Sequence, residues 1–261
     1  MSLDISGLLS DWPYEPGQIN ARLVTGLDGE PKVQIRLDLG ILQMNAEGRP
    51  DGQRPFGFPS LLEYYESKLD ESKAESASET DSSTPEKDRA DRFRLNEDDC
   101  RALRDEAVQY YHRYVALLVL EDFEGVIRDT TRNLRVLDFC ATHAETENDR
   151  TVLEQFRPYI TMMRARAMAS QAIKDNEPKA AVHALDEGLN ALRQHFESAG
   201  QPQMFEESSE AEVLRGMREA LVPKLPMSQK GELKARLQRA LDAENYELAA
   251  ILRDELRLLK D

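Results

Sequence analysis

Apolar residues alternate with polar ones near the start of this chain, and they recur at helical spacing over most of the rest. Over residues 19–23 and 33–39 they occupy every second position, which is typical of strands with one buried face. From residue 97 onward they fall three and four positions apart, which is typical of amphipathic helices. The pattern predicts a mainly α fold with a small N-terminal antiparallel β-ribbon and a C-terminal helical hairpin.

The β-ribbon is predicted from two alternating runs on either side of a turn. Asp28-Gly29 is a strong hairpin signal, and the second strand is expected to continue into residues 41–44. The alternating apolar positions are Ile19, Ala21, Leu23, Val33, Ile35, Leu37 and Leu39. Because a two-stranded ribbon is marginal in water, we expect it to pack on the helices that follow. We assign residues 1–69 to this N-terminal region, including a Gly- and Pro-rich loop at 48–60 and a short helix at 61–69.

Residues 70–92 are acidic, rich in serine and almost devoid of apolar side chains. Such a segment cannot bury enough surface to offset the entropy of ordering it. We therefore predict a flexible linker or a long solvated loop there.

A helical domain is predicted over residues 93–222. Asn96 is a favourable N-cap residue, and three acidic residues follow it in the first helical turn. A long apolar face follows, and polar breaks near residues 121 and 146 divide the domain into helix pairs.

Three segments at 121–134, 176–189 and 244–257 open in the same way, with small and branched residues where a second helix would cross its partner. The first two resemble tetratricopeptide-type second helices, in which Gly125 and Ala180 would face the first helix. Neither first helix carries the W-x2-L-G-x2-Y order of that family. The resemblance implies tetratricopeptide-like helix pairs.

Two closely spaced prolines at 223–226 separate this domain from a hairpin at 228–261. The apolar stripe of the first helix consists of Leu233, Leu237, Ala240 and Leu241. The stripe of the second consists of Ala249, Leu252, Leu256 and Leu259. So short a link requires the two helices to be antiparallel, and the small Ala249 and Ala250 allow them to approach closely.

This C-terminal segment resembles the UVR motif, the helical hairpin shared by the UvrB and UvrC excision-repair subunits, some Clp-type ATPases and the protein-arginine-kinase activators. The matching residues are Leu233, Leu237, Ala240, Glu244, Tyr246, Glu247, Ala249, Ala250, Leu252, Arg253, Asp254, Glu255 and Leu259. Asn245 stands where the family usually has Asp. Leu248, Ile251 and Leu258 stand where the family is usually polar.

Those three departures form a second apolar stripe, which makes the second helix apolar around roughly half its circumference. One hairpin partner cannot cover so wide a face. We interpret the surplus as a surface covered by another UVR hairpin or by the protein's own body; the alternative is that both stripes are intramolecular core. The predicted partner-binding residues are Leu233, Leu237, Tyr246, Leu248, Ala249, Ala250, Ile251, Leu252, Arg253, Leu256, Leu258 and Leu259.

The formal net charge of −15 disfavours direct contact with nucleic acid, because Lys and Arg neutralising phosphate supply most of that affinity.

Cys100 and Cys140 are far apart in sequence and are predicted to be buried free thiols of a reducing compartment. His143 precedes acids at 145, 147 and 149, but no second histidine follows one turn later, so a metal site is not predicted. Without a nucleophile elbow or a GxGxxG segment, we predict no enzyme activity and no cofactor.

The chain has no basic, apolar signal sequence at its start and no run of about 20 apolar residues, so it is predicted to be cytoplasmic. We predict a non-enzymatic adaptor that binds a protein partner through its UVR hairpin. The resemblance implies a bacterial protein linked to excision repair, Clp ATPases or arginine-kinase regulation. Its partner would be another UVR-bearing protein or a second copy of itself. The alternative is a self-contained helical scaffold whose hairpin docks intramolecularly and whose β-ribbon or helical concavity binds the partner.

Overall fold

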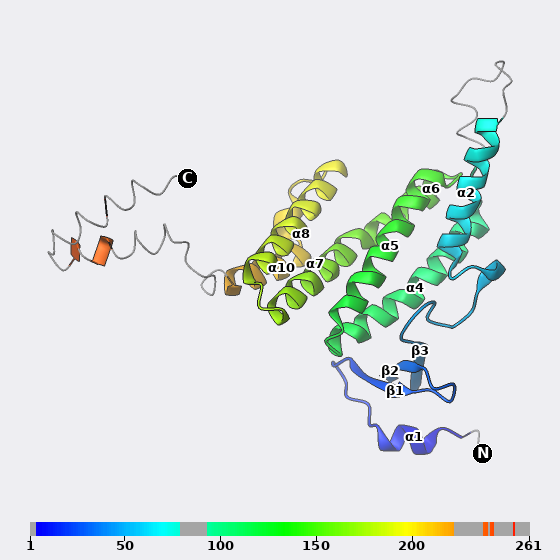
Figure 1. Ribbon diagram of the computed structural model, residues 1–261, viewed down its shortest axis with the longest axis horizontal. Coiled ribbons are helices and arrows are strands. Elements are labelled where there is room, and N and C mark those ends of the chain that lie inside the picture. Colours follow the sequence, from blue (N-terminus) through cyan, green and yellow to red (C-terminus); the bar gives the residue numbers. More distant parts are fainter. Residues whose placement is uncertain (1–3, 79–92, 222–236, 240, 243–252, 254–261) are drawn as a thin grey trace. The chain divides into compact units, whose positions relative to one another are not determined.

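The computed structural model describes residues 4–78, 93–221, 237–239, 241–242 and 253. The chain divides into two compact units, Met1–Arg218 and Glu219–Asp261. The first unit is mainly helical and carries a small antiparallel sheet near its N-terminus, as predicted (Figure 1).

The elements follow one another in a simple order. The N-terminal ones are α1 (Ser6–Asp11), β1 (Asn20–Thr25), β2 (Pro31–Leu37), β3 (Gly40–Asn45), η1 (Pro55–Gly57) and α2 (Leu61–Ser78). The helical ones are α4 (Glu97–Val119), α5 (Phe123–His143), α6 (Glu147–Thr151), η2 (Glu154–Phe156), α7 (Arg157–Lys174), α8 (Pro178–Ser198), α9 (Met204–Glu207) and α10 (Ser209–Leu221).

The sheet has three strands in the order β1-β2-β3, so the prediction that the second strand continues into residues 41–44 was wrong. The chain turns at Asp38 and Leu39, and Leu37 pairs with Gly40 across this turn. The Asp38 carboxylate accepts a hydrogen bond from the Leu39 amide (2.9 Å), which stabilises the turn. Because alternation stays in phase on either side of a two-residue turn, periodicity alone did not reveal it.

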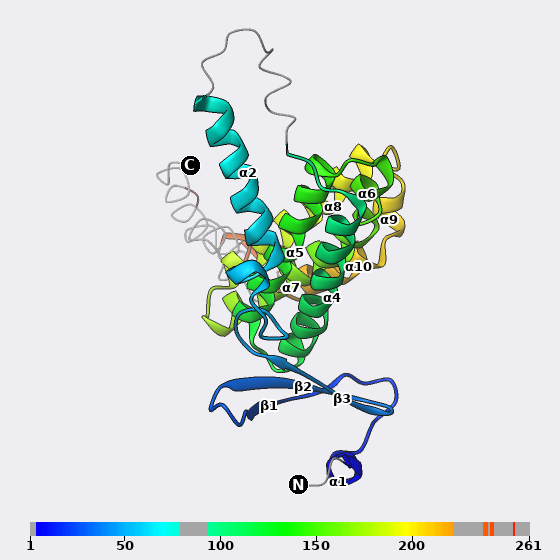
Figure 2. The same cartoon turned by 90° about the vertical axis from the view of Figure 1, so that its right-hand side faces the viewer.

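One face of the sheet packs on α4 (Figure 2). Val33, Ile35 and Met44 are buried on this face, whereas Leu37 at its end remains 45% exposed. On the other face Trp12 donates from Nε1 to Asn20 Oδ1 (2.9 Å). The ribbon is thus stabilised by the helical body, as the marginal stability of isolated hairpins requires.

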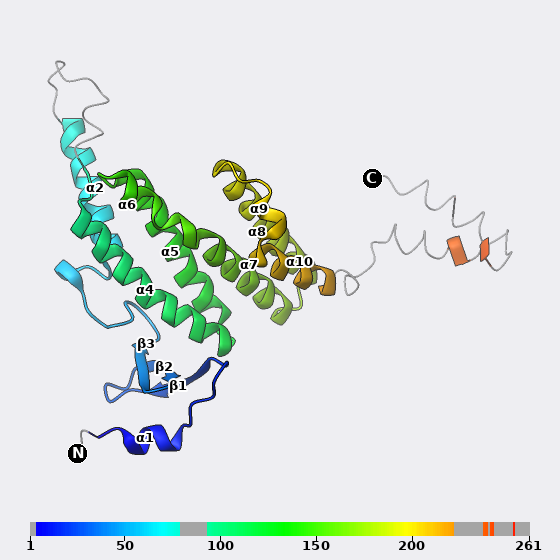
Figure 3. The same cartoon turned by 180° about the vertical axis from the view of Figure 1, so that it is seen from behind.

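The helices pack in sequence, α4 on α5, α5 on α7 and α7 on α8 (Figure 3). Gly125 faces α4 as expected, since a Cβ there would lie 2.8 Å from Leu117 Cδ1. Ala180, in contrast, is exposed, and α8 approaches α7 closely at Gly188, where a Cβ would lie 2.4 Å from that of Ala165. The small residue at that crossing is therefore two turns further along α8 than the tetratricopeptide likeness implied.

Helix α2 extends beyond its predicted end at Leu69, into the acidic segment. Lys68 pairs with Glu71 at 2.9 Å, one turn apart on its surface. Such pairs and the many good helix formers in this stretch favour helix even where few apolar contacts are available.

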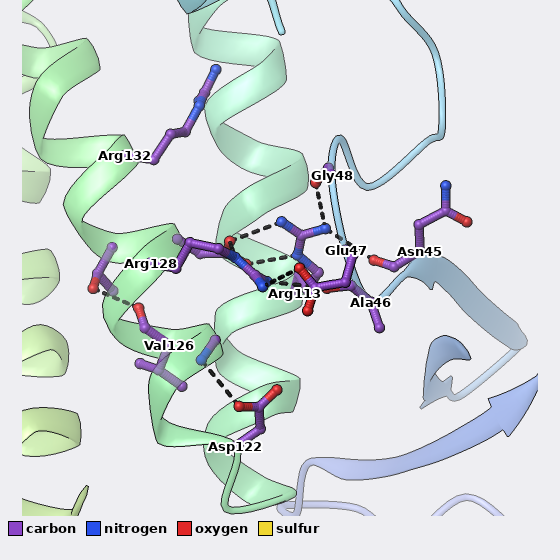
Figure 4. Close-up of polar contacts among 12 residues, drawn as sticks. Asn45, Ala46, Glu47, Gly48, Arg113, Asp122, Val126, Arg128 and Arg132 are labelled. Carbon is purple, nitrogen blue, oxygen red and sulfur yellow. Dashed lines mark hydrogen bonds and ion pairs between the residues drawn. The ribbon is translucent and has the colours of Figure 1, made fainter. Parts of the chain in front are cut away.

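A buried ion pair joins the helical body to the end of the sheet (Figure 4). Arg113 of α4 donates from Nε and Nη2 to the two carboxylate oxygens of Asp129 on α5, at 2.6 and 2.8 Å. Its Nη1 donates to the carbonyls of Asn45 (3.0 Å), the last residue of β3, and Gly48 (2.7 Å), in the loop that follows. Arg128 reaches the same segment by donating to the carbonyl of Ala46 (3.1 Å). The Arg113 guanidinium therefore holds α4, α5 and the loop after β3 together.

A second buried carboxylate attaches α2 in the same way. Glu106 of α4 accepts hydrogen bonds from the Leu61 amide at the start of α2, at 2.9 and 3.1 Å. Arg132 of α5 donates to the same carboxylate, and Arg49 Nε lies 3.6 Å away. Negative charge beside a helix N-terminus is favourable, so Glu106 both caps α2 and fixes its position.

The two cysteines, far apart in sequence, meet in the core between α4 and α5. Cys100 and Cys140 are free thiols, as predicted, with exposed fractions of 0% and 1%. The ends of the two helices are joined by hydrogen bonds from the Leu95 amide to the His143 carbonyl (2.9 Å) and from the Glu145 amide to the Leu95 carbonyl (3.0 Å). Burial raises the pKa of Cys100 to about 11 and that of Cys140 to about 12.

We expect Arg113→Ala to destabilise the first unit by about 3–5 kcal/mol, because it leaves Asp129 charged and buried without its partner. The measurement is urea unfolding followed by the fluorescence of Trp12, the single tryptophan, which reports on the sheet. Arg101→Ala is the matched control, since Arg101 and its partner Asp98 are exposed; its effect should be about 0–1 kcal/mol. Equal losses of unfolding free energy in the two variants would show that the buried ion pair stabilises the unit no more than an exposed one does.

Both thiols should be unreactive towards a chromogenic disulfide reagent at pH 8 in the folded protein, because the thiolate is the nucleophile. Both should react once denaturant is added. Their folded pKa values exceed the ordinary value of 9.0, so their contribution to stability is complete below pH 9 and is lost as the pH rises through 11 and 12. Rapid labelling of either thiol in the native protein would contradict this packing.

Candidate interaction sites

The predicted partner-binding hairpin lies in the second unit, of which the structure describes a few residues. Residues 237–239, 241–242 and 253 are helical, as the pattern predicted. Leu237 is partly buried, whereas Leu241 on the same stripe is 43% exposed. The Gln238 side chain donates from Nε2 to Asp242 Oδ1 (2.8 Å), one helical turn away. Arg253 is helical and exposed.

The remaining predicted partner-binding residues lie outside the described part of the chain. They are Leu233, Tyr246, Leu248, Ala249, Ala250, Ile251, Leu252, Leu256, Leu258 and Leu259. The surplus apolar stripe on the second hairpin helix therefore stays a prediction.

The buried carboxylates among the described residues of the first unit are held in ion pairs with arginine. Glu106 and Asp129 are each paired with arginine, as described above. Asp149, one of the acids that follow His143, accepts from Arg104 Nη1 at 2.7 Å, and this hydrogen bond, with a second from Thr146, lowers its pKa. Across the described residues, no three His, Cys, Asp or Glu side chains are grouped to hold a metal ion. These charges serve to position helices.

Sequence reasoning missed an apolar pocket between α4, α5 and the start of α7. Its volume is about 590 Å³, within the about 300–1,000 Å³ typical of ligand pockets. The lining residues are Arg104, Ala107, Val108, Tyr111, His112, Tyr114, Asn133, Leu137, Leu153, Phe156, Tyr159 and Ile160. Most of them belong to the apolar stripes expected to form the core. The signal that could have found the pocket is Val108, which widens the apolar face of α4 beyond what α5 covers.

The pocket wall is uncharged near neutral pH, apart from one paired arginine. Burial lowers the pKa of His112, which favours its neutral form. Burial also raises the pKa values of Tyr114 and Tyr159, so both hydroxyls stay protonated. The Arg104 guanidinium is engaged with Asp149. Such a wall is suited to an apolar group.

No helix in the described ranges is long and apolar enough to cross a membrane.

Comparison with known proteins identifies the C-terminal segment alone. No curated protein and no solved structure matches the chain. The tetratricopeptide likeness of the helix pairs is not confirmed. The model of the UvrB/uvrC motif family matches residues 228–261, which confirms the resemblance seen in the sequence.

Proposed function

We propose that this protein is a non-enzymatic adaptor that binds another protein through its C-terminal UVR hairpin. The match of residues 228–261 to the UvrB/uvrC motif carries the proposal. A hairpin of this length is below the about 40 residues usually needed to fold unaided, so partner contacts stabilise it. The three apolar residues at positions usually polar in the motif, Leu248, Ile251 and Leu258, supply the surface for those contacts.

The partner in this proposal is another UVR-bearing protein or a second copy of the chain. The motif points to a bacterial, cytoplasmic protein linked to excision repair or to Clp and arginine-kinase regulation. Since the net charge is −15, contact with DNA in a repair role would be made by the partner. Helix-on-helix burial of apolar side chains would supply the affinity.

One observation favours a second candidate function. The apolar pocket on the helical body offers a protein-binding surface in the first unit. In this alternative the protein is a self-contained scaffold, and the body rather than the hairpin recruits the partner.

We expect Ile251→Glu and Ala250→Glu each to reduce recovery of the partner at least about tenfold, because an unpaired carboxylate would be buried in the interface. The measurement is affinity capture with the tagged full-length chain, combined with light scattering to follow self-association. Gln238→Glu is the matched control, because it adds the same charge at an exposed position of the same hairpin.

Unchanged recovery and unchanged mass for both variants would refute the proposal. A chain ending at residue 222 distinguishes the two candidate functions. If this shortened chain captures the partner as strongly as the full-length chain, the body alone is the binding unit and the scaffold function is correct.

A further inference from the structure

Three large apolar side chains that are exposed on the helical body meet at one place. Val108 and Tyr111 of α4 and Phe156 of η2 are 51%, 40% and 52% exposed, and all three line the pocket of about 590 Å³. A contiguous apolar surface of this kind, on a protein in which 32% of residues are charged, marks a site of interaction. The surface lies in the first unit.

The pocket is preformed. Its floor consists of Tyr114, Leu137 and Ile160, which are at most 5% exposed. At the rim, the ring of Tyr111 packs edge-on against Tyr114 at 5.5 Å and lies 6.2 Å from Tyr159. Aromatic rings held in this way provide a large contact area at little entropic cost. An apolar side chain of a ligand could therefore bind without rearrangement of the pocket.

Two of the arginines near the pocket, Arg104 and Arg157, are held in ion pairs. Arg104, which lines it, is bonded to Asp149 at 2.7 Å. Arg157, directly after Phe156, binds two carboxylates, those of Glu154 (2.6 Å) and Asp138 (2.8 Å). With two carboxylates for one guanidinium, the Arg157 group leaves a surplus of negative charge beside the apolar surface.

One further carboxylate, and one pair of opposite charges, flank the pocket. Asp105 lies one turn before Val108 on the same side of α4 and has no ion pair within the described part of the chain. Burial raises the pKa of Tyr159, while the charge of Arg166 lowers it and that of Glu210 raises it, so these two opposite charges offset one another beside Tyr159. Around the pocket the carboxylates outnumber the arginines.

We propose that this groove binds a basic segment of a partner protein, which inserts a large apolar side chain between Val108 and Phe156 and places Lys or Arg beside Asp105. The pocket supplies affinity by apolar burial, and the acidic rim selects the charge of the segment. Because the rim charges are exposed, binding weakens with salt, over a screening length of about 8 Å at physiological ionic strength. The proposal does not rest on the hairpin's binding a partner, so the failure of the adaptor proposal would leave it standing.

The test uses two labelled synthetic peptides, each with one Leu and one Phe spaced a helical turn apart. Lysines flank the apolar pair in one peptide, and glutamates flank it in the other. Fluorescence anisotropy with the full-length chain should show binding of the lysine peptide at least about tenfold tighter than that of the glutamate peptide. Val108→Ser and Phe156→Ser should each weaken it at least about fivefold, because apolar contact area is lost.

Val119→Ser is the matched control: Val119 is also on α4 and is 47% exposed, but it does not line the pocket. It should bind the lysine peptide like the unaltered chain. Asp105→Lys should reduce the preference for the lysine peptide. Ile251→Glu, in the hairpin, should leave peptide binding unchanged, which separates this site from the adaptor function.

Equal binding of the two peptides, or unaltered binding by both serine variants of the pocket, would overturn the proposal. Light scattering provides a separate check. A concentration-dependent dimer that Val108→Ser dissociates would assign the groove to a second copy of the chain, and would also overturn it.

Discussion

The bidentate ion pair between Arg113 and Asp129 is the interaction on which the first unit depends. Both side chains are 1% exposed, and the remaining donor group of Arg113 holds two loop carbonyls. A buried pair of this kind contributes little net stability compared with apolar packing, yet losing one partner is costly. The ion pair therefore acts mainly by fixing the position of the sheet on the helices.

The same logic explains why α4 carries both the buried charges and the apolar pocket. Arg113 and Glu106 face the N-terminal segments, whereas Val108 and Tyr111 lie on another face of the helix and open to solvent. Since Glu106 anchors α2 and Arg113 anchors the sheet, α4 cannot rotate to bury the pocket-lining residues. The fixed orientation of α4 keeps this apolar surface exposed, at the expense of the burial that a rotation would gain.

The sequence predicted the helices and the packed β-ribbon because these depend on local periodicity. The third strand was missed because the turn at Asp38 and Leu39 keeps the alternation in phase. The buried charges were missed for a different reason: Arg113 and Asp129 are typical surface residues, and only tertiary pairing makes their burial favourable. The pocket was missed because a stripe of apolar positions does not show which of them a neighbouring helix leaves uncovered.

The hairpin and the groove differ in chemistry, and this difference bears on how a partner would be chosen. The hairpin has balanced charge and surplus apolar residues, so the proposed contact there would distinguish partners mainly by shape. The proposed contact in the groove would add an acidic rim that disfavours acidic segments. A partner that engages both gains from effective concentration, because the second contact becomes intramolecular once the first has formed. Two individually weak contacts on one chain would then select a partner that carries both a matching hairpin and a basic apolar segment.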